Sequence, residues 1–292
     1  MTAALIEGAA IAAGVREDVR RRVAAMARPP VLATVLVGDD PASEIYIARK
    51  RATCVELGMR DLHHRLPADV TQAEAGALLA SLSLDRDVNG ILLQLPLPAH
   101  LDARRLLALI HPDKDVDGLT SESAGRLALG EPGLRPCTPM GVMALLDAHE
   151  VAIAGAEAVV VGRSDLVGRP LAQMLLERDA TVTSCHKGTR DLSAETRRAD
   201  VLVVAAGVRD LIRRDDVKPG ATVVDVGIHR TAEGVRGDVA FAEVAEVAGL
   251  MTPVPGGVGP MTIAMLMANT ADAVVLQDRA RRAAREDLAA RA

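Results

Sequence analysis

The segment most informative about the architecture is Ala158-Val-Val-Val-Gly-Arg-Ser-Asp-Leu-Val-Gly168. Its apolar start predicts a short buried strand, Gly162 and Gly168 flank a tight turn, and a helix is expected over 170–178. A helix that begins directly after such a turn presents N–H groups and the positive end of its dipole to a phosphate. The segment is therefore typical of a dinucleotide-binding unit, although Ser164 stands at the second glycine position of a strict G-x-G-x-x-G pattern.

The residues that follow strengthen this interpretation. Further short strands are expected over 180–184, 200–206 and 221–226, which is the layout of a doubly wound domain. A site that prefers NAD has an acidic residue about 20 positions after the glycine turn. This chain instead has no acid at the end of the second strand, and Arg163 and Lys187 are available to a ribose phosphate. The pattern favours NADP.

The N-terminal half also alternates between strands and helices, which predicts a second parallel sheet with helices on both faces. The expected strands cover 31–37, 59–66 and 90–95, and the expected helices cover 4–27, 41–57, 71–84 and 102–109. A helix near Pro139 is expected to link the two halves, and a long helix is expected to begin at Pro260. We therefore predict two α/β domains, each with three layers and a mostly parallel sheet. Their predicted ranges are 1–138, completed by the helix 262–292, and 139–261.

Composition excludes several classes of protein. The 292 residues are 49% hydrophobic and carry a formal net charge of −5, which argues against a non-specific nucleic-acid binder. Aromatic residues make up only 1%, so base-stacking surfaces are not expected. The three cysteines are far apart, which favours a reducing compartment and gives no zinc pattern. With no signal or membrane-spanning pattern apparent, we expect a cytoplasmic protein.

Several polar residues are candidates for catalysis. Tyr46 and Lys50 lie four positions apart on an expected helix and so share one face. The same Tyr-x-x-x-Lys spacing occurs in short-chain dehydrogenases, but there the pair follows the nucleotide motif, whereas here it precedes it. Gln94 ends an apolar strand beside prolines and requires hydrogen-bond partners if it is buried. Asp115 and Asp117 are either functional carboxylates or turn caps.

Taken together, these motifs resemble one family. They occur in the order Gly38-Asp-Asp-Pro-Ala-Ser-Glu-Ile-Tyr-Ile-Ala-Arg-Lys50, Gln94-Leu-Pro-Leu-Pro98, Lys114-Asp-Val-Asp-Gly118, Pro136-Cys-Thr-Pro139, Val161-Gly-Arg-Ser164 and Pro253-Val-Pro-Gly-Gly-Val-Gly-Pro-Met-Thr262. Over nearly its whole length the chain resembles the bifunctional methylenetetrahydrofolate dehydrogenase/methenyltetrahydrofolate cyclohydrolases of one-carbon metabolism.

The resemblance implies an N-terminal folate domain and a Rossmann domain that binds NADP, with both substrates in the cleft between them. It also implies that the C-terminal helix packs back on the first domain. A homodimer joined through the Rossmann domains is expected, with tetrahydrofolate derivatives as ligands and neither nucleic acid nor membrane as partner. No metal is implied.

Residue roles also follow from the resemblance. Lys50 would be the catalytic lysine, Tyr46 would stack on the folate, Gln94 would hydrogen-bond Lys50, and Asp117 would bind the pterin. The remaining substrate contacts would be Leu95, Pro255, Gly256 and Gly257. The expected cofactor contacts are Gly162, Arg163, Ser164, Gly168, Lys187 and Ile228.

The chemistry of the family accounts for these residue types. A hydride leaves the methylene carbon of 5,10-methylenetetrahydrofolate, and the folate nitrogens stabilise the resulting cation, so orientation of the two rings matters more than a strong acid. Water then adds to the methenyl product and the ring opens to 10-formyltetrahydrofolate. This second step needs proton transfer, which Lys50 could supply if burial lowers its pKa toward neutrality.

The chain departs from the family pattern at three positions. Lys187 replaces the usual serine after the Cys-His pair, Ser123 stands where asparagine is frequent, and His229 replaces the usual asparagine beside Ile228. The changes at Lys187 and His229 affect the expected affinity for the cofactor, and the change at Ser123 affects the expected local contacts with the folate.

Two other functions are compatible with parts of the pattern. Relatives of shikimate dehydrogenase share the two-domain architecture but lack the Gln94 motif and the motif over 253–262. A catalytically silent NADP-binding scaffold would bind the cofactor tightly without hydride transfer, which the Tyr46, Lys50, Gln94 and Asp117 set argues against. A dehydrogenase with weak cyclohydrolase activity also remains open.

Overall fold

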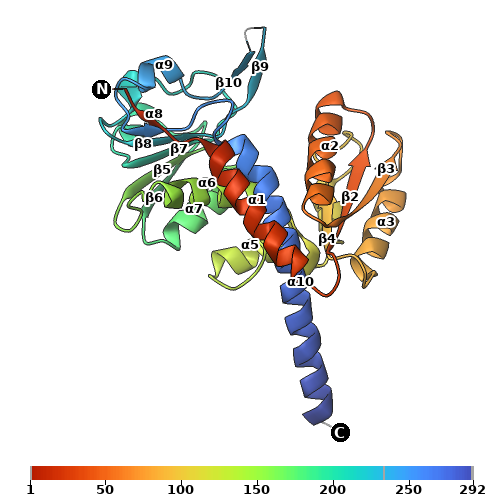
Figure 1. Ribbon diagram of the computed structural model, residues 1–292. Coiled ribbons are helices and arrows are strands. Elements are labelled where there is room, and N and C mark those ends of the chain that lie inside the picture. The colour runs from red at the N-terminus through yellow and green to blue at the C-terminus, as the bar shows by residue number, and fades with distance from the viewer. Residues whose placement is uncertain (1, 233, 291–292) are drawn as a thin grey trace. The chain divides into compact units, whose positions relative to one another are not determined.

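The computed structural model describes residues 2–232 and 234–290, which form two compact units (Figure 1). One unit combines Met1–Gly14 with Pro136–Met265, and the other combines Val15–Arg135 with Leu266–Ala292. We call them the six-stranded unit and the three-stranded unit after their described sheets. The boundaries between the units fall inside helix α1 (Gly8–Ala24) and helix α10 (Val258–Ala290).

The three-stranded unit contains a parallel sheet in the order β3-β2-β4. Its strands are β2 (Val31–Val37), β3 (Arg60–Leu66) and β4 (Gly90–Leu93). Its helices are α2 (Pro41–Glu56), α3 (Gln72–Leu84), α4 (Ala103–Leu107), the 3₁₀ turn η1 (Pro112–Lys114) and α5 (Ser121–Ala128). Every residue of β2 is buried, as expected for a central parallel strand covered on both faces.

Local sequence explains where the helices of this unit begin. The Asp40 side chain accepts a hydrogen bond from the Ser43 N–H at 2.8 Å, and Pro41 occupies the first position of α2. Thr71 and Glu74 form a reciprocal capping box at the start of α3. Alternate residues of β2 pack with α3 and α4 in one apolar core, while α2 contacts the same sheet. The expected strands and helices of this unit are therefore present, with ends shifted by one or two residues.

The six-stranded unit contains a fully parallel sheet in the order β1-β11-β8-β7-β5-β6. Its strands are β1 (Ala4–Leu5), β5 (Glu157–Val161), β6 (Thr181–Cys185), β7 (Val201–Val204), β8 (Thr222–Asp225) and β11 (Leu250–Met251). An antiparallel hairpin pairs β9 (His229–Thr231) with β10 (Gly234–Arg236). Its helices are α6 (Cys137–Ala148), α7 (Gly168–Leu176), α8 (Leu192–Thr196), the 3₁₀ turn η2 (Arg214–Asp216) and α9 (Phe241–Val244).

Strand order places the potential ligand crevice of this unit. Counted from β5, the strands run 2-1-3-4-5, the second common doubly wound order, with β1 added at one edge. The order reverses between β5 and β7, and ligands of such sheets bind outside the carboxyl ends of the strands at that point. The turn after β5 and the loop after β7 therefore flank the crevice.

The N-terminus differs from our expectation. We expected one helix over 4–27 within a domain beginning at residue 1, but Ala4–Leu5 form a strand and α1 begins only at Gly8. The reason is main-chain pairing: β1 lies parallel to β11, and the Ile6 N–H donates to the Met251 carbonyl at 2.8 Å. Residues 1–14 consequently belong to the unit that contains 136–265.

Helix α10 is about as long as expected, but it contains a more apolar stretch than we expected. Over Val258–Ala283 it is long and apolar enough to cross a membrane by length and composition alone, a property that we had not expected of any segment. Most of that stretch is buried inside the protein, as in the core helix of a globular protein. Within the three-stranded unit, Asn269 of α10 donates to the carbonyls of Val116 and Arg135, each at 2.8 Å.

Candidate active site

A buried lysine and an amide form the centre of the candidate site in the three-stranded unit. Lys50 lies on α2 and has only 7% of its surface exposed. Its Nζ donates a hydrogen bond to Gln94 Oε1 at 3.1 Å. Gln94 directly follows β4, where its own N–H donates to the Val35 carbonyl at 2.9 Å and its Nε2 donates to the Leu95 carbonyl at 2.6 Å. The amide is thus fixed by the sheet and holds the lysine nitrogen in turn.

The expected neighbours of this pair are half-buried. Tyr46 lies one helical turn before Lys50 on the same face of α2. Leu95 follows Gln94 at the carboxyl end of β4 and is also half-buried. Side chains that are partly covered in this way can contact a ligand without leaving the fold.

The two aspartates of the loop after η1 have different surroundings. Asp115 has 1% of its surface exposed and accepts hydrogen bonds from the Leu119 and Thr120 N–H groups and from Ser123 Oγ, at 2.7–3.0 Å. Burial raises the pKa of the Asp115 carboxyl, while these hydrogen bonds act in the opposite direction. Asp117 is half-buried, and no ion pair or side-chain hydrogen bond involves it within the described residues. Asp115 therefore holds the loop together, while Asp117 is free to meet a ligand.

Ser123, one of the departures from the family pattern, belongs to the Asp115 network. It is buried, its N–H donates to Thr120 Oγ1 at 3.1 Å, and its hydroxyl donates to Asp115 at 2.7 Å. Its observed contacts are therefore with the loop that carries Asp117.

The glycine turn of the six-stranded unit is too tight for side chains. Gly162 has φ +124°, and a Cβ built there would lie 2.1 Å from the Ala205 carbonyl oxygen of the loop after β7. A Cβ at Gly168 would lie 2.1 Å from the Gly162 carbonyl oxygen. Ser164 closes the turn by accepting the Val167 N–H at 3.1 Å. This geometry fits a pyrophosphate, because it lets the main chain come close and starts α7 directly behind the turn.

The expected cofactor side chains follow neighbouring strands. In the β5–β6 register Val161 lies opposite Cys185, so Arg163 and Lys187 each stand two residues past a carboxyl strand end. Both are exposed, and no acid ends β6. Ile228 is 50% exposed in the loop after β8. These positions suit the ribose phosphate and the ring end of a dinucleotide.

The loop over 253–257 belongs to the same unit and is held by its own main chain. The Gly257 N–H donates to the Pro253 carbonyl at 2.9 Å, and the Gly8 N–H donates to the Gly256 carbonyl at 2.9 Å. Pro255 is exposed. The loop is therefore rigidly attached while part of it remains accessible to a ligand.

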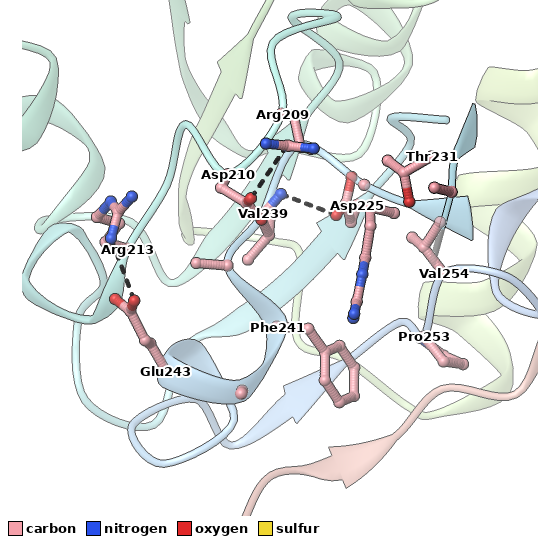
Figure 2. Close-up of a pocket in the computed structure, with 15 residues that line it drawn as sticks. Arg209, Asp210, Arg213, Asp225, Thr231, Val239, Phe241, Glu243, Pro253 and Val254 are labelled. Atoms are coloured by element: carbon pink, nitrogen blue, oxygen red, sulfur yellow. Dashed lines mark hydrogen bonds and ion pairs between the residues drawn. The ribbon is translucent and has the colours of Figure 1, made fainter. Parts of the chain in front are cut away.

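A polar pocket of about 680 Å³ opens beside the end of β8 (Figure 2). Arg209 and Asp210 form an ion pair at 3.4 Å on one side, and Arg213 pairs with Glu243 at 3.2 Å. None of the expected cofactor residues lines it, although Pro253 and Val254 of the loop just described do. Phe241 completes one wall.

Sequence reasoning missed the buried carboxylates behind this pocket. Asp225 and Asp238 have 4% and 0% of their surface exposed, and His229 Nε2 lies 2.7 Å from Asp238 Oδ1. The available signal was a carboxylate at the end of an otherwise apolar strand, since buried acids require partners. His229 was singled out only as a departure from the family pattern.

Two family models match the chain. The catalytic-domain model of tetrahydrofolate dehydrogenase/cyclohydrolase matches residues 6–117, and the NAD(P)-binding-domain model of the same family matches residues 136–278.

Similar proteins agree with these matches. A bifunctional protein FolD 2 of Frankia alni is 64% identical over 274 residues, which cover 92% of this chain and 95% of the relative. The crystal structure of the bifunctional FolD methylenetetrahydrofolate dehydrogenase/cyclohydrolase of Campylobacter jejuni has a TM-score of 0.91 and 46% identity, covering 94% of this chain and 99% of that one. The Trypanosoma brucei dehydrogenase-cyclohydrolase, complexed with NADP cofactor and inhibitor, has a TM-score of 0.90 and 36% identity, with coverages of 96% and 99%.

Proposed function

The chain belongs to the tetrahydrofolate dehydrogenase/cyclohydrolase family, and from that premise we propose how its own residues carry out the two reactions. It is a bifunctional enzyme that uses NADP to oxidise 5,10-methylenetetrahydrofolate to 5,10-methenyltetrahydrofolate, which it hydrolyses to 10-formyltetrahydrofolate. The observation that carries the residue assignment is the hydrogen bond from the buried Lys50 amine to Gln94.

The oxidation is mainly a matter of orientation. When bound, NADP supplies the acceptor for the hydride that leaves the methylene carbon. The folate nitrogens stabilise the cation that results, so the protein needs no strong acid for this step. Tyr46 stacks on the flat rings of the folate, Asp117 accepts hydrogen bonds from the pterin, and Leu95 contacts the same ligand. These contacts fix the orientation of the reacting carbon.

The hydrolysis requires proton transfer, and Lys50 performs it. Water attacks the methenyl carbon and loses one proton to the Lys50 amine, which leaves a hydroxyl on that carbon. As the carbon–nitrogen bond breaks, Lys50 returns this proton to the departing folate nitrogen, and the hydroxyl proton is released to water as the formyl carbonyl forms. An amide oxygen can accept a hydrogen bond from either an ammonium or a neutral amine. Gln94 therefore keeps the lysine nitrogen in place through both protonation states.

The cofactor is held by the turn after β5 and by exposed side chains around it. Gly162, Ser164 and Gly168 bring main-chain groups and the start of α7 to the pyrophosphate. Arg163 and Lys187 bind the ribose phosphate, which distinguishes NADP from NAD. Ile228 contacts the ring end of the cofactor.

We also propose a cytoplasmic homodimer joined through the nucleotide-binding domains, as the family resemblance implies. The three widely spaced cysteines suit a reducing compartment. Analytical ultracentrifugation of the full chain tests the assembly, since a monomer at micromolar concentration would contradict it.

An assay of the purified chain tests the proposed function. Methylenetetrahydrofolate is mixed with NADP or with NAD, and the absorbance of the methenyl product is followed as it forms and decays. We expect formation with NADP, slower formation with NAD, and decay that continues after NADP is consumed. A silent scaffold would bind NADP without forming the methenyl product.

A further inference from the structure

A fully buried carboxylate connects two loops of the six-stranded unit. Asp238 follows β10 and has 0% of its surface exposed. Its Oδ2 accepts the main-chain N–H groups of Ala206 and Gly207 at 2.7 and 2.8 Å, and its Oδ1 lies 2.7 Å from His229 Nε2. The side chain of His229 is 24% exposed. Asp238 thus joins the loop after β7 to the residue that begins β9.

A second buried carboxylate supports the first. Asp225 accepts the main-chain N–H groups of Gly227, Asp238 and Val239, each at 2.9 Å, and the bond from Val239 borders the pocket in Figure 2. A Cβ at Gly237 would lie only 1.8 Å from Asp225 Oδ2, so this close approach requires glycine. The network is therefore built into the backbone of the segment.

Both connected loops lie where the cofactor is proposed to bind, and the inference rests on that proposal. Ala205, next to Ala206, is the residue whose carbonyl oxygen lies against Gly162. Ile228 directly precedes His229. One hydrogen bond from an imidazole therefore helps to set the geometry of loops that follow two adjacent strands, β7 and β8.

Charged groups lie on each segment around His229. Asp238 is in contact with it, and Asp225 accepts the main-chain N–H of Asp238. Arg236 is the direct cross-strand partner of His229 in the hairpin, and Arg230 is the next residue of β9. In the loop after β7, Arg209 and Asp210 pair with each other.

The pKa of the second carboxylate, Asp225, lies above its ordinary value. Burial raises the pKa of Asp225 to about 6, and the charge of Asp238 adds to the effect. An imidazole ordinarily titrates in the same range. If Nε2–H donates to Asp238, the other ring nitrogen is an acceptor in the neutral form and a donor in the imidazolium form.

We propose that His229 is a positioning residue for the NADP-binding loops and that its protonation is linked to binding of the anionic cofactor. The imidazolium places a positive charge one residue from Ile228, which favours a ligand carrying several negative charges. By linkage, bound NADP stabilises the protonated form of His229 to the same extent. NADP should then bind more tightly at acidic pH than at alkaline pH.

Calorimetric titration of the full chain with NADP at about pH 6 and about pH 8 tests the inference. The 2′-phosphate itself titrates near pH 6, so the wild type is compared with variants and NAD serves as a second probe. His229→Gln keeps a neutral N–H donor for Asp238, and His229→Asn restores the residue usual in the family. His149→Gln is the matched control, since the described side-chain hydrogen bond of His149 goes to the Leu145 carbonyl of its own helix end.

We expect the ratio of the two dissociation constants to be about three- to tenfold larger in the wild type and in His149→Gln than in either His229 variant, with both cofactors. Buffers of different ionisation enthalpy should show proton uptake on binding that the His229 variants lack. Parallel pH profiles for the wild type and His229→Gln would overturn the inference, as would a uniform weakening at both pH values. Loss of all NADP binding in the wild type would instead remove the cofactor assignment on which it rests.

Discussion

Two lysines of the three-stranded unit are equally buried, each with 7% of its surface exposed, but they have different partners. Lys114 donates to the main-chain carbonyls of Leu82 and Asp85, at 3.3 and 2.5 Å. Lys50 donates to the side-chain amide of Gln94 at 3.1 Å. Main-chain acceptors are fixed by the fold, so Lys114 fastens η1 to the end of α3. Burial alone therefore does not distinguish the two lysines, and they differ in that the partner of Lys50 is a side chain at a strand end.

Apart from replacement of Lys50 itself, the largest effect expected from this comparison is at its partner, Gln94. Gln94→Leu removes the acceptor that positions the amine, and a hydrogen bond to a charged group contributes about 1.5–3 kcal/mol. We therefore expect the hydrolysis of methenyltetrahydrofolate to slow by about 10- to 100-fold. The rate is measured from the decay of methenyl absorbance.

A matched control for Gln94 exists on α10. Gln277 is also buried but donates to the main-chain carbonyls of Asn89 and Asp113, at 2.8 and 2.9 Å. Gln277→Leu should lower stability and leave the rate per folded molecule within about twofold, since surface and packing changes outside the site act through folding. Equal slowing in both variants would mean that Gln94 has no special role.

Lys114 should show the opposite behaviour to Lys50. Lys114→Met leaves buried carbonyls without their donor, which costs about 1–3 kcal/mol of unfolding free energy. Urea unfolding measures this loss, and the activity of the folded fraction should be nearly unchanged. A Lys114→Met protein of unchanged stability but reduced hydrolysis would contradict the structural role that we assign to Lys114.

The comparison extends to a buried carboxylate bonded to the main chain. Burial raises the pKa of Asp225 from 3.8 to about 6, so the folded state binds its proton more tightly than the unfolded state does. This contribution to stability is complete below about pH 4 and is lost as the pH rises to about 6. The Asp225→Asn variant should lack this pH dependence. The difference in unfolding free energy between wild type and variant should therefore change between about pH 4 and about pH 6. An identical slope in both proteins would show that Asp225 does not titrate in this range.

The smallest effect is expected at an exposed lysine. Lys187→Ser removes a positive charge that water already screens, so we expect NADP to bind about two- to fivefold more weakly and NAD to bind equally well. Titrations with both cofactors measure the ratio. An equal loss for NAD would indicate that Lys187 does not contact the 2′-phosphate.

Much of the fold could be predicted because its signals are local. The apolar run 31–37 indicates the strand β2, and the prolines and glycines around α2 mark the ends of that helix. The strand Ala4–Leu5 could not be predicted, because only its distant partner β11 distinguishes it from the start of an alanine-rich helix. The conformation of this segment is set by its pairing with a distant strand, and local sequence propensity carries no information about that pairing.

The residues of the candidate site could be predicted from the sequence, but their contacts could not. Its residues came from motif order, and the pairing of Lys50 with Gln94 depends on two strands and a helix folding together. For Asp115, the sequence left a functional carboxylate and a turn cap as alternatives, and its three observed donors decide for an anchor of the loop. The network of Asp225, Asp238 and His229 was missed because most of its hydrogen bonds come from main-chain N–H groups, which residue types do not reveal.

The central claim is tested most directly by supplying methenyltetrahydrofolate without NADP to the wild type, Lys50→Met and Lys114→Met at matched folded fractions. We predict that Lys50→Met hydrolyses it about 10²- to 10⁴-fold more slowly, the usual contribution of a general acid–base group, while still binding NADP. Lys114→Met should match the wild type. Hydrolysis by Lys50→Met at the wild-type rate would contradict the account.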